Sequence, residues 1–279
     1  MTSMASTSSP ALASPSNPRI KSVARLRDRR ERASSGLTLV DGAREVRRAR
    51  DAGVEVIEVF VCEPLLAGED ARAALDGLSP RNVPVTTTTE AAFAKIAFGD
   101  RAEGIVAVVR APSLMLADLR LPDDPLVVIV EGVEKPGNVG AVLRSADGAG
   151  ADALVAASPR TDLANPNVIR ASAGTIFAVP LAAAPSDEVL AWLRERGLRV
   201  VAARVDAERP YTDADLTGPL ALVLGSETDG LTEAWRIDGV ETVRLPMHGI
   251  ADSLNVSVSA AILLYEARRQ RDRHRDSPD

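Results

Sequence analysis

The sequence contains almost no cysteine or histidine. Among its 279 residues there are one cysteine, Cys62, and two histidines, His248 and His274. A single thiol cannot form an internal disulfide, and so few thiol and imidazole groups leave no ligand set for a structural zinc ion. We therefore expect no metal site, and we interpret Cys62 as a small apolar core residue.

Aromatic residues and long apolar runs are also scarce. Aromatic residues make up 3% of the chain, which argues against an extensive platform for stacking bases and leaves Ala, Val and Leu to fill the core. No apolar run approaches the roughly 20 residues that span a bilayer, so no membrane is expected as a partner. Residues 1–18 carry no charge and lack the basic start and apolar stretch of a signal peptide. We interpret them as a disordered tail and expect a cytoplasmic protein.

The net charge of −6 argues weakly against nucleic acid as a partner, but the basic residues are clustered. Residues 19–32 contain seven basic residues against two acidic ones, and residues 268–275 contain five against one. Each cluster fits either a phosphate-binding surface or a solvated helix face, and the sequence leaves both interpretations open.

The first half of the chain alternates short helical and strand-like segments. The pattern predicts helices at 20–32, 42–52, 71–78 and 89–97, and strands at 37–40, 54–62 and 104–109. This order is typical of a small α/β domain, which we place at residues 19–111. Pro112, Pro122 and Pro125 then mark a linker at residues 112–124.

From residue 125 onward, apolar strands alternate with helices. The predicted strands are 126–130, 153–157, 176–179, 198–203, 220–224 and 242–245, and the predicted helices are 139–148, 167–173, 187–196 and 253–271. Strands that alternate with helices form a parallel sheet, which binds ligands at the carboxyl ends of its strands. We therefore predict a doubly wound α/β domain at residues 125–279.

Three short blocks in this domain carry polar residues at predicted strand ends. The first runs from Glu131 to Arg144 and places Asn138 just after the turn residues Pro136 and Gly137. Alone, it fits a helix N-cap at Asn138 and a surface arginine. It lacks the glycine spacing of dinucleotide-binding and phosphate-binding loops, which argues against a dinucleotide-dependent enzyme.

The second block, residues 222–231, is a strand that leads into a polar turn with Glu227, which alone fits a solvated turn residue. The third block runs from Leu245 to Ser257 and brings Ser253, Asn255 and Ser257 to the expected start of the last helix. A helix cap explains one of these three polar residues and leaves the others as a surplus.

In this order, the three blocks resemble the signature motifs of the SpoU methyltransferases. They read N-x-G-A-x-x-R, L-G-S-E-x-x-G-L and L-P-M…S-L-N-V-S-x-S-A-A-I-x-x-Y-E within residues 126–268. The N-terminal half resembles, more loosely, the small ribosomal-protein-like RNA-binding domain of many members. That likeness rests on the basic start and on Leu39-Val40-Asp41-Gly42 followed by a helix.

The resemblance implies that the parallel sheet of the C-terminal domain is threaded into a trefoil knot, which periodicity cannot show. In the family the loops of the knot bind S-adenosylmethionine in a bent form. The matching cofactor positions in this sequence are Leu224, Gly225, Leu245, Met247, Leu254 and Ser257. Family members work as homodimers, with the active site close to the subunit interface.

The implied reaction is transfer of a methyl group to a ribose 2′-hydroxyl of RNA. The matching catalytic positions are Arg144, Asn138, Glu227, Ser253 and Asn255. Arginine is a poor base because its pKa exceeds about 12, so we expect Arg144 to be essential and leave its proton role open. Asn138 would hold the substrate or Arg144, Glu227 would orient groups, and Ser253 and Asn255 would position the ribose. Glu131 receives no role.

The separate N-terminal domain favours ribosomal RNA as the substrate, because an extra module helps to hold a large structured RNA. The resemblance extends to actinobacterial antibiotic-resistance enzymes of the avilamycin or thiostrepton type, which act on large-subunit ribosomal RNA. A transfer RNA 2′-O-methyltransferase and a non-catalytic RNA-binding protein with the same fold are the alternatives.

Overall fold

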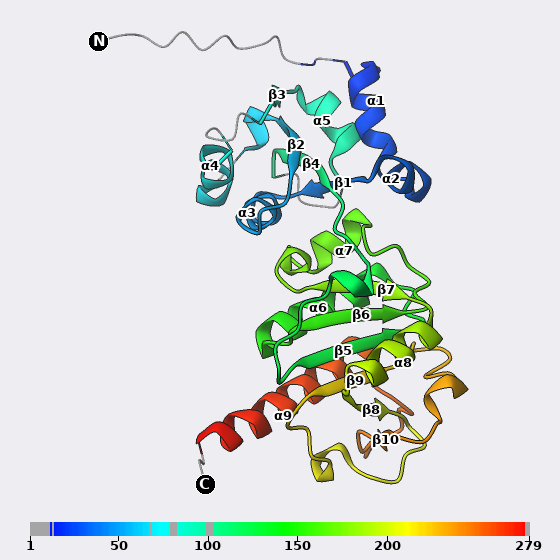
Figure 1. Cartoon of the computed structure of the whole chain (residues 1–279). Coiled ribbons are helices and arrows are strands. Elements are labelled where there is room, and N and C mark those ends of the chain that lie inside the picture. Colours follow the sequence, from blue (N-terminus) through cyan, green and yellow to red (C-terminus); the bar gives the residue numbers. More distant parts are fainter. Residues whose placement is uncertain (1–11, 13, 67, 79–82, 99–102, 277–279) are drawn as a thin grey trace. The chain divides into compact units, whose positions relative to one another are not determined.

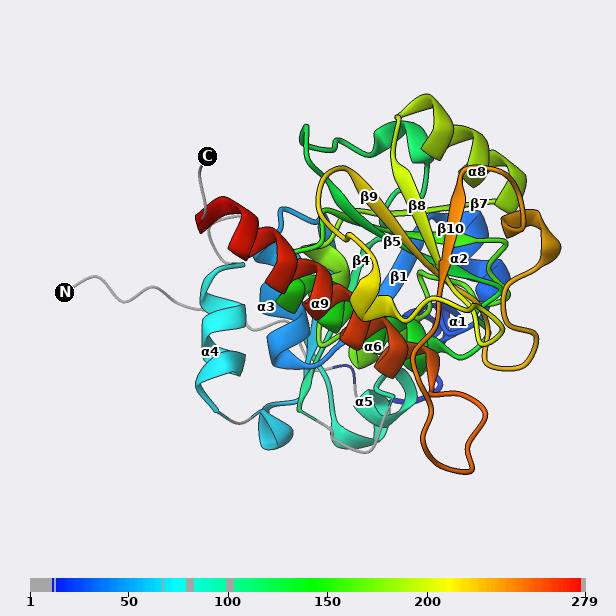
Figure 2. The same cartoon turned by 90° about the horizontal axis from the view of Figure 1, so that it is seen from below.

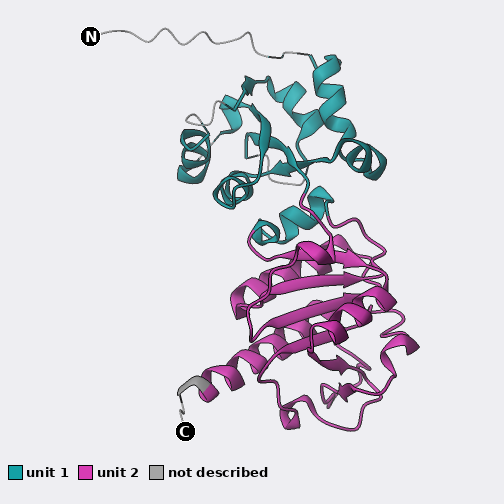
Figure 3. Ribbon diagram, viewed as in Figure 1, with its two compact units in different colours: residues 1–111, 164–177 teal, residues 112–163, 178–279 magenta. Residues whose placement is uncertain are grey.

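The computed structural model describes residues 12, 14–66, 68–78, 83–98 and 103–276. The chain forms two compact units (Figure 3). Unit 1 contains Met1–Ala111 and Ala164–Phe177, and unit 2 contains Pro112–Leu163 and Ala178–Asp279. Most of the tail predicted at residues 1–18 lies outside the described residues, and its last two residues, Asn17 and Pro18, form the cap and first residue of a helix.

Unit 1 is built on a four-stranded mixed sheet in the order β1-β4-β2-β3 (Figure 1). The strands are β1 (Leu37–Asp41), β2 (Val56–Val61), β3 (Val85–Thr87) and β4 (Ile105–Arg110). β4 is antiparallel to β1 and β2, whereas β3 is parallel to β2. The strands predicted near residues 37–40, 54–62 and 104–109 are confirmed. β3 escaped prediction because three residues are too few to show an alternation.

The helices of unit 1 are α1 (Pro18–Arg25), α2 (Arg29–Ser35), α3 (Ala43–Asp51), α4 (Glu69–Asp76), α5 (Glu90–Ile96) and α7 (Pro166–Ala171), with the 3₁₀ turns η1 (Glu63–Leu65) and η4 (Thr175–Phe177). The prediction of one helix over residues 20–32 is wrong because Asp28 interrupts it. The Asp28 carboxylate accepts a hydrogen bond from the Arg30 backbone N–H at 2.7 Å, which starts a new helix instead of continuing α1. The apolar side of α1 packs into a core that contains Phe60 and Phe93.

Unit 2 contains a six-stranded sheet in the order β10-β8-β9-β5-β6-β7, with every pairing parallel. Its strands are β5 (Leu126–Glu131), β6 (Ala153–Ala157), β7 (Leu181–Ala184), β8 (Arg199–Ala203), β9 (Leu220–Leu224) and β10 (Val240–Val243). The predicted parallel sheet is confirmed, but the strand predicted at residues 176–179 is wrong. Ala173 and Gly174 turn the chain with positive φ angles, and the Ser172 hydroxyl accepts a hydrogen bond from the Gly174 N–H at 3.2 Å.

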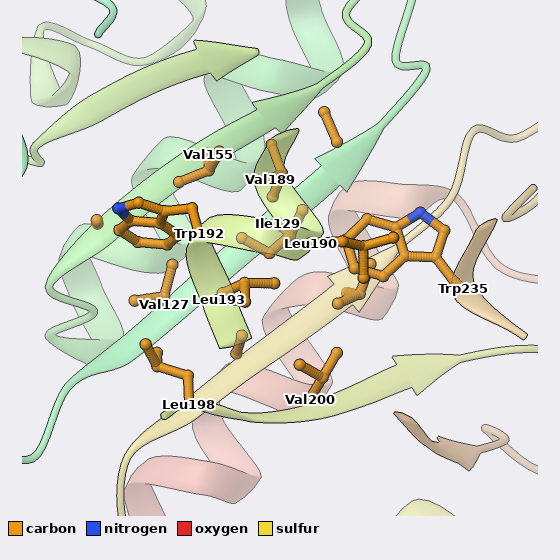
Figure 4. Close-up of a cluster of buried hydrophobic side chains, with 14 of the residues drawn as sticks. Val127, Ile129, Val155, Val189, Leu190, Trp192, Leu193, Leu198, Val200 and Trp235 are labelled. Atoms are coloured by element: carbon orange, nitrogen blue, oxygen red, sulfur yellow. The ribbon is translucent and has the colours of Figure 1, made fainter. Parts of the chain in front are cut away.

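Helices cover both faces of this sheet. They are α6 (Pro136–Ala149), α8 (Ser186–Glu195) and α9 (Val256–Asp276), and the 3₁₀ turn η3 (Leu116–Asp118) precedes them. On one face, Trp192 and Leu193 of α8 pack in a buried cluster with Val127, Ile129 and Trp235 (Figure 4). On the other face α6 and α9 run side by side (Figure 2). Both faces can be covered because alternate residues of a strand point to opposite faces of the sheet. None of the helices in the described part of the chain is long and apolar enough to cross a membrane.

The later strands of unit 2 are joined without α-helices in the described structure. Only the 3₁₀ turns η5 (Tyr211–Asp213) and η6 (Glu233–Trp235) lie between β8 and β9 and between β9 and β10. Because β10, β8 and β9 are neighbours in the sheet, the loops that follow them emerge together at one edge. This carboxyl edge is where a parallel sheet binds ligands. The trefoil knot remains a prediction.

The opposite, amino edge of the sheet is closed by the end of α9. The Arg271 guanidinium, in a residue only 3% exposed, donates to the backbone carbonyl of Pro125 at 3.0 Å and to that of Gly218. Arg268 donates to the carbonyls of Ala149 and Gly150 at 2.7 and 2.8 Å. These two members of the basic cluster at residues 268–275 therefore hold backbone groups of unit 2 and not a phosphate.

Candidate cofactor pocket and catalytic cluster

Three loops at the carboxyl edge of unit 2 enclose a pocket of about 510 Å³. They follow β8, β9 and β10, and the start of α9 completes the wall. The lining comprises residues 203–206, 224–231, 244–247 and 252–254, with Val256 and Ser259. Leucine and methionine side chains lie beside charged, hydroxyl and backbone groups, a combination that suits a small cofactor with apolar and polar parts.

The turn after β9 closes on itself at Gly225. A Cβ atom at this position would lie 2.1 Å from the carbonyl carbon of Gly230, so glycine is required for the close backbone approach. The Ser226 carbonyl accepts a hydrogen bond from the Gly230 N–H at 3.0 Å, and its hydroxyl accepts one from the Asp229 N–H at 3.1 Å. These bonds fix the turn that carries Glu227.

Asn138, Glu227 and Asn255 come from the three separate sequence blocks and converge at the pocket. The side-chain amide of Asn255 donates to Asn138 Oδ1 at 3.3 Å and to Glu227 Oε1. Glu227 Oε2 accepts a hydrogen bond from Lys135 Nζ at 3.2 Å. We call Lys135, Asn138, Glu227 and Asn255 the polar cluster. Asn255 is exposed and Asn138 is half-buried, so the cluster is open to a ligand at Asn255.

Asn255 has a second function as the cap of the last helix. Its Oδ1 accepts hydrogen bonds from the backbone N–H and the hydroxyl of Ser257, at 2.9 and 2.6 Å. The cap leaves the side-chain NH₂ group free to point at Asn138 and Glu227. The cap interpretation is thus correct for Asn255. It is wrong for Asn138, which lies in the first turn of α6 after Pro136 and Gly137.

Arg144 lies farther along α6, away from the polar cluster. Six residues separate it from Asn138, or about 9 Å along the helix axis. The side chain is exposed, and its guanidinium has no hydrogen bond or ion pair with the residues that the structure describes. Arg144 is therefore available to bind a ligand or a second chain.

The structure places the predicted cofactor positions as follows. Leu224, Gly225, Leu245, Met247 and Leu254 line the pocket, as does Ser253. Ser257 is absent from the lining and instead bonds to Asn255. Val256 and Ser259 line the pocket but were not predicted, because the sequence does not show at which residue α9 begins.

Ion pairs link the loops around the pocket. The Arg160 guanidinium contacts Glu134 at 2.6 Å and Asp229 at 2.9 Å, and these hydrogen bonds raise the pKa of Arg160. In the loop after β8, a hydrogen bond from Arg204 lowers the pKa of Asp206. Most of these side chains are well exposed, so each pair contributes little to stability, but together they restrict where the loops lie.

Two residues of the first block have partners that the sequence did not indicate. Lys135 pairs with Glu227 across 92 positions of sequence. Glu131 is buried and accepts hydrogen bonds from Ser186 and Thr232. Neither partner lies at a spacing that a sequence pattern reveals. The described residues contain no group of three or more His, Cys, Asp or Glu side chains that could hold a metal ion.

A parallel α/β sheet with a pocket and an open polar cluster at its carboxyl edge defines a cofactor-binding enzyme of the α/β class. The profile of the SpoU rRNA Methylase family matches residues 125–265, and that of an MRM3-like substrate binding domain matches residues 17–107. The chain belongs to the SpoU family.

Individual proteins resemble the chain along most of its length. A 23S rRNA (uridine(2479)-2′-O)-methyltransferase of Streptomyces viridochromogenes is 34% identical over 255 residues, covering 88% of this chain and 87% of the relative. The crystal structure of an RNA 2′-O ribose methyltransferase is 43% identical, with a TM-score of 0.83 and coverage of 94% of this chain and 99% of that one.

A third similar protein is the SpoU methyltransferase AviRb of Streptomyces viridochromogenes, solved in complex with the cofactor AdoMet. It is 31% identical, with a TM-score of 0.81, and the match covers 91% of this chain and 98% of that one. The predicted family and the α/β fold with an N-terminal substrate-binding domain are confirmed.

Proposed function

We propose that this chain transfers a methyl group from S-adenosylmethionine to a ribose 2′-hydroxyl of large-subunit ribosomal RNA. The observation that carries the proposal is the joining of pocket and polar cluster at one edge of the sheet, through residues of all three SpoU blocks. Membership of the family makes the chain an RNA methyltransferase with S-adenosylmethionine as its cofactor. A similar protein that acts on 23S rRNA supports the choice of RNA.

The pocket fits S-adenosylmethionine in size and in chemistry. Its volume of about 510 Å³ lies within the range of small-molecule sites. Leu224, Leu245 and Leu254 provide apolar contact, and the surrounding loops provide backbone and hydroxyl groups for hydrogen bonds. When bound, this cofactor supplies an activated methyl group on a sulfonium centre.

The polar cluster and Arg144 orient the RNA. Asn255 and Lys135 hold the Glu227 carboxylate in place, so that a ribose hydroxyl meets an acceptor whose position is already fixed. The Ser253 hydroxyl on the pocket wall contacts the ribose. Arg144 uses its planar fork to bind a phosphate, because a guanidinium stays charged at neutral pH and does not accept a proton.

Unit 1 holds the RNA through part of its basic start. Lys21, Arg29 and Arg30 are exposed and have no side-chain partner among the described residues. Other basic residues of the segment are engaged, since Arg19 pairs with Glu58 and Arg32 is buried. Three unpaired cations on one short segment suit contacts with phosphates, which position an RNA without reading its sequence.

We further propose that the active form is a homodimer in the cytoplasm, with α6 and α9 facing the second copy. Val258 and Tyr265 of α9 are 46% and 54% exposed, and their spacing of seven residues puts both on one face of the helix. A second copy would cover this apolar face and bring the site close to the subunit interface. Sedimentation of the full chain as a monomer at micromolar concentration would contradict the dimer.

The decisive experiment is incubation with tritiated S-adenosylmethionine and unmodified total RNA, followed by mapping of the labelled nucleotide. We expect label on one 2′-hydroxyl of large-subunit ribosomal RNA. Label on transfer RNA would keep the reaction and overturn the substrate. No label on either RNA, despite measured cofactor binding, would favour a non-catalytic RNA-binding protein.

The proposal of antibiotic resistance has its own test. The chain is expressed in a bacterium that is sensitive to avilamycin or thiostrepton, with the Arg144→Ala variant as the control. We expect the wild-type chain alone to raise the inhibitory concentration of one of these drugs. Equal susceptibility of the two strains to both drugs would refute a resistance function.

A further inference from the structure

Glu131 ends strand β5 as a buried carboxylate, 2% exposed, that takes no part in the reaction proposed above. The hydroxyls of Ser186 and Thr232 donate to its Oε1 at 2.6 and 2.9 Å, and the Thr232 backbone N–H donates to its Oε2 at 2.8 Å. It makes no ion pair with a described residue. A carboxylate without a cation is costly to bury unless hydrogen bonds satisfy its oxygens, and here three donors do so.

Two of the three hydrogen bonds come from Thr232, where the turn after β9 ends. The sheet fixes the beginning of the same turn, because Val130 of β5 pairs with Leu224 of β9. Glu131 follows Val130 and therefore lies beside Gly225, the first residue of the turn. The end of β5 thus holds both ends of one turn, through backbone pairing at its beginning and through a carboxylate at its end.

This turn is the part of unit 2 that joins the pocket to the polar cluster. Residues 224–231 line the pocket, and Glu227 at its middle bonds to Asn255. The backbones of Gly225 and Gly230 lie so close that a Cβ at Gly225 would collide with Gly230. Because the two ends of the turn approach each other this closely, we expect a shift of Thr232 to be passed on to the rest of the turn.

We infer that Glu131 is a positioning residue whose carboxylate holds the turn at 225–232 and thereby sets the affinity for the cofactor and the place of Glu227. The inference rests on the proposed function, because it takes S-adenosylmethionine as the ligand of the pocket. Glu131 is not among the residues that line the cofactor pocket, and in this inference it acts on the pocket through Thr232.

The third hydrogen bond provides a matched control. Ser186 donates to the same Glu131 oxygen but belongs to the start of α8, where it also bonds to the Ser158 hydroxyl at 3.0 Å. If Glu131 merely satisfied buried groups, loss of the Ser186 hydroxyl and loss of the Thr232 hydroxyl would have the same effect. If Glu131 holds the turn, only the Thr232 side affects the cofactor.

The test uses the full chain, with S-adenosylmethionine binding measured by calorimetry and the folded state checked by thermal unfolding. We expect Glu131→Ala to raise the cofactor Kd about tenfold, because the Thr232 N–H loses its acceptor. Thr232→Ala keeps the backbone bond and has a smaller effect of about threefold, whereas Ser186→Ala changes the Kd by less than about twofold. Glu131→Gln, which retains one acceptor oxygen, recovers part of the affinity.

A second measurement tests the connection between the two residues. The double variant Glu131→Ala with Thr232→Ala is expected to bind the cofactor as Glu131→Ala alone does, because both changes break one contact. An unchanged Kd in folded Glu131→Ala, or equal effects of Ser186→Ala and Thr232→Ala, would overturn the inference. If Glu131→Ala does not fold, the comparison of Ser186→Ala with Thr232→Ala decides. Failure of the wild-type chain to bind the cofactor would instead refute the proposed function.

Discussion

The two edges of the six-stranded sheet use similar polar side chains for opposite purposes. At the amino edge, Arg271 donates to carbonyls that precede β5 and β9, and Asp152 accepts a hydrogen bond from the Leu126 N–H at 2.8 Å. At the carboxyl edge, Glu227 and Asn255 bond to each other beside an open pocket. The first edge satisfies its backbone groups, whereas the second keeps polar groups accessible. The type of a polar residue therefore does not tell whether its role is structural or functional. What tells the two roles apart is whether the hydrogen-bonding groups of the side chain are all occupied by other parts of the chain.

Two arginines on the packed helices α6 and α9 sharpen this contrast. Arg271 of α9 is buried and bonds to backbone carbonyls, whereas Arg144 of α6 is exposed and has no partner among the described residues. We expect removal of the first to damage folding and removal of the second to damage catalysis.

The largest effect is expected for Arg144→Ala, which should lower methyl transfer to RNA about 1,000-fold, because oriented charged groups typically contribute this much. The free energy of unfolding should change by less than about 0.5 kcal/mol, as for other exposed positions without partners. Tritium transfer and denaturant unfolding measure the two quantities. Arg144→Lys, which keeps the charge and loses the planar fork, should also be poorly active. If the Arg144→Ala variant were fully active, Arg144 would have no role in the reaction.

Arg271→Ala should destabilise the chain by about 3 kcal/mol, because it removes the arginine donor to the carbonyls of Asp124 and Gly218 and one of the two donors to that of Pro125. Urea unfolding of the full chain measures this loss. The exposed neighbour Arg273 is the control, and Arg273→Ala should change stability by less than about 0.5 kcal/mol. Cofactor affinity of the folded fraction should stay at the wild-type value. Equal free energies of unfolding for the two variants would contradict a stabilising role of Arg271 at the amino edge of the sheet.

Gly225→Ala should weaken cofactor binding about 30-fold, because the added Cβ would collide with Gly230 and force the turn apart. Titration of the purified variant with S-adenosylmethionine measures its Kd for the cofactor. Gly249→Ala is the control, since a Cβ at Gly249 meets no atom within 4 Å. Similar affinities of the two variants would show that the turn does not need its close approach.

Asp41 in unit 1 is a buried carboxylate that can be compared with Glu131 of unit 2. Glu131 accepts three hydrogen bonds, whereas Asp41 has the Phe98 N–H and Arg170 as its partners. Burial raises its pKa from 3.8 to about 6, against the opposing effects of the Phe98 N–H and of Arg170, while Glu103 and Glu45 add to the rise. Between these two pKa values the folded chain binds more protons than the unfolded chain, so the free energy of unfolding falls as the pH rises.

We expect the contribution of Asp41 to this loss to be about 2 kcal/mol between pH 4.5 and 6.5. Denaturant unfolding of the wild-type chain and of Asp41→Asn at several pH values isolates it, because the difference between the curves cancels the other titrating groups. Stability relative to the variant should be greatest at the lowest pH. A difference that does not change with pH would show that Asp41 titrates at its ordinary pKa.

The sequence predicts best those features that depend on continuous segments. β5, β6 and β9 were predicted within one residue, because strands buried on both faces are uninterrupted apolar runs. The three site blocks were found because each lies at a strand end and keeps its motif. The split between α1 and α2 was missed because it depends on one side-chain hydrogen bond, at the N-cap Asp28, which the apolar pattern of the sequence does not reveal.

Contacts between distant residues explain the remaining errors and omissions. Lys135 meets Glu227 across 92 positions and Glu131 meets Thr232 across 101, and no local pattern encodes either pairing. The arginines near residue 270 fitted a phosphate-binding surface or a solvated helix face in the sequence. The structure shows that two of them, Arg268 and Arg271, instead bind backbone carbonyls. Sequence patterns thus locate the polar residues, and only the fold shows which of them already have partners.

The double function of Asn255 has a consequence for the time at which the enzyme becomes active. A ribosome adds residues in the order of the sequence, so unit 1 is complete once Phe177 has emerged. The pocket and the polar cluster must wait for Asn255, and the amino edge of the sheet must wait for Arg271. The nascent protein therefore completes unit 1 well before it can complete the pocket and the polar cluster, so the substrate-binding domain is able to fold before the site that it serves exists.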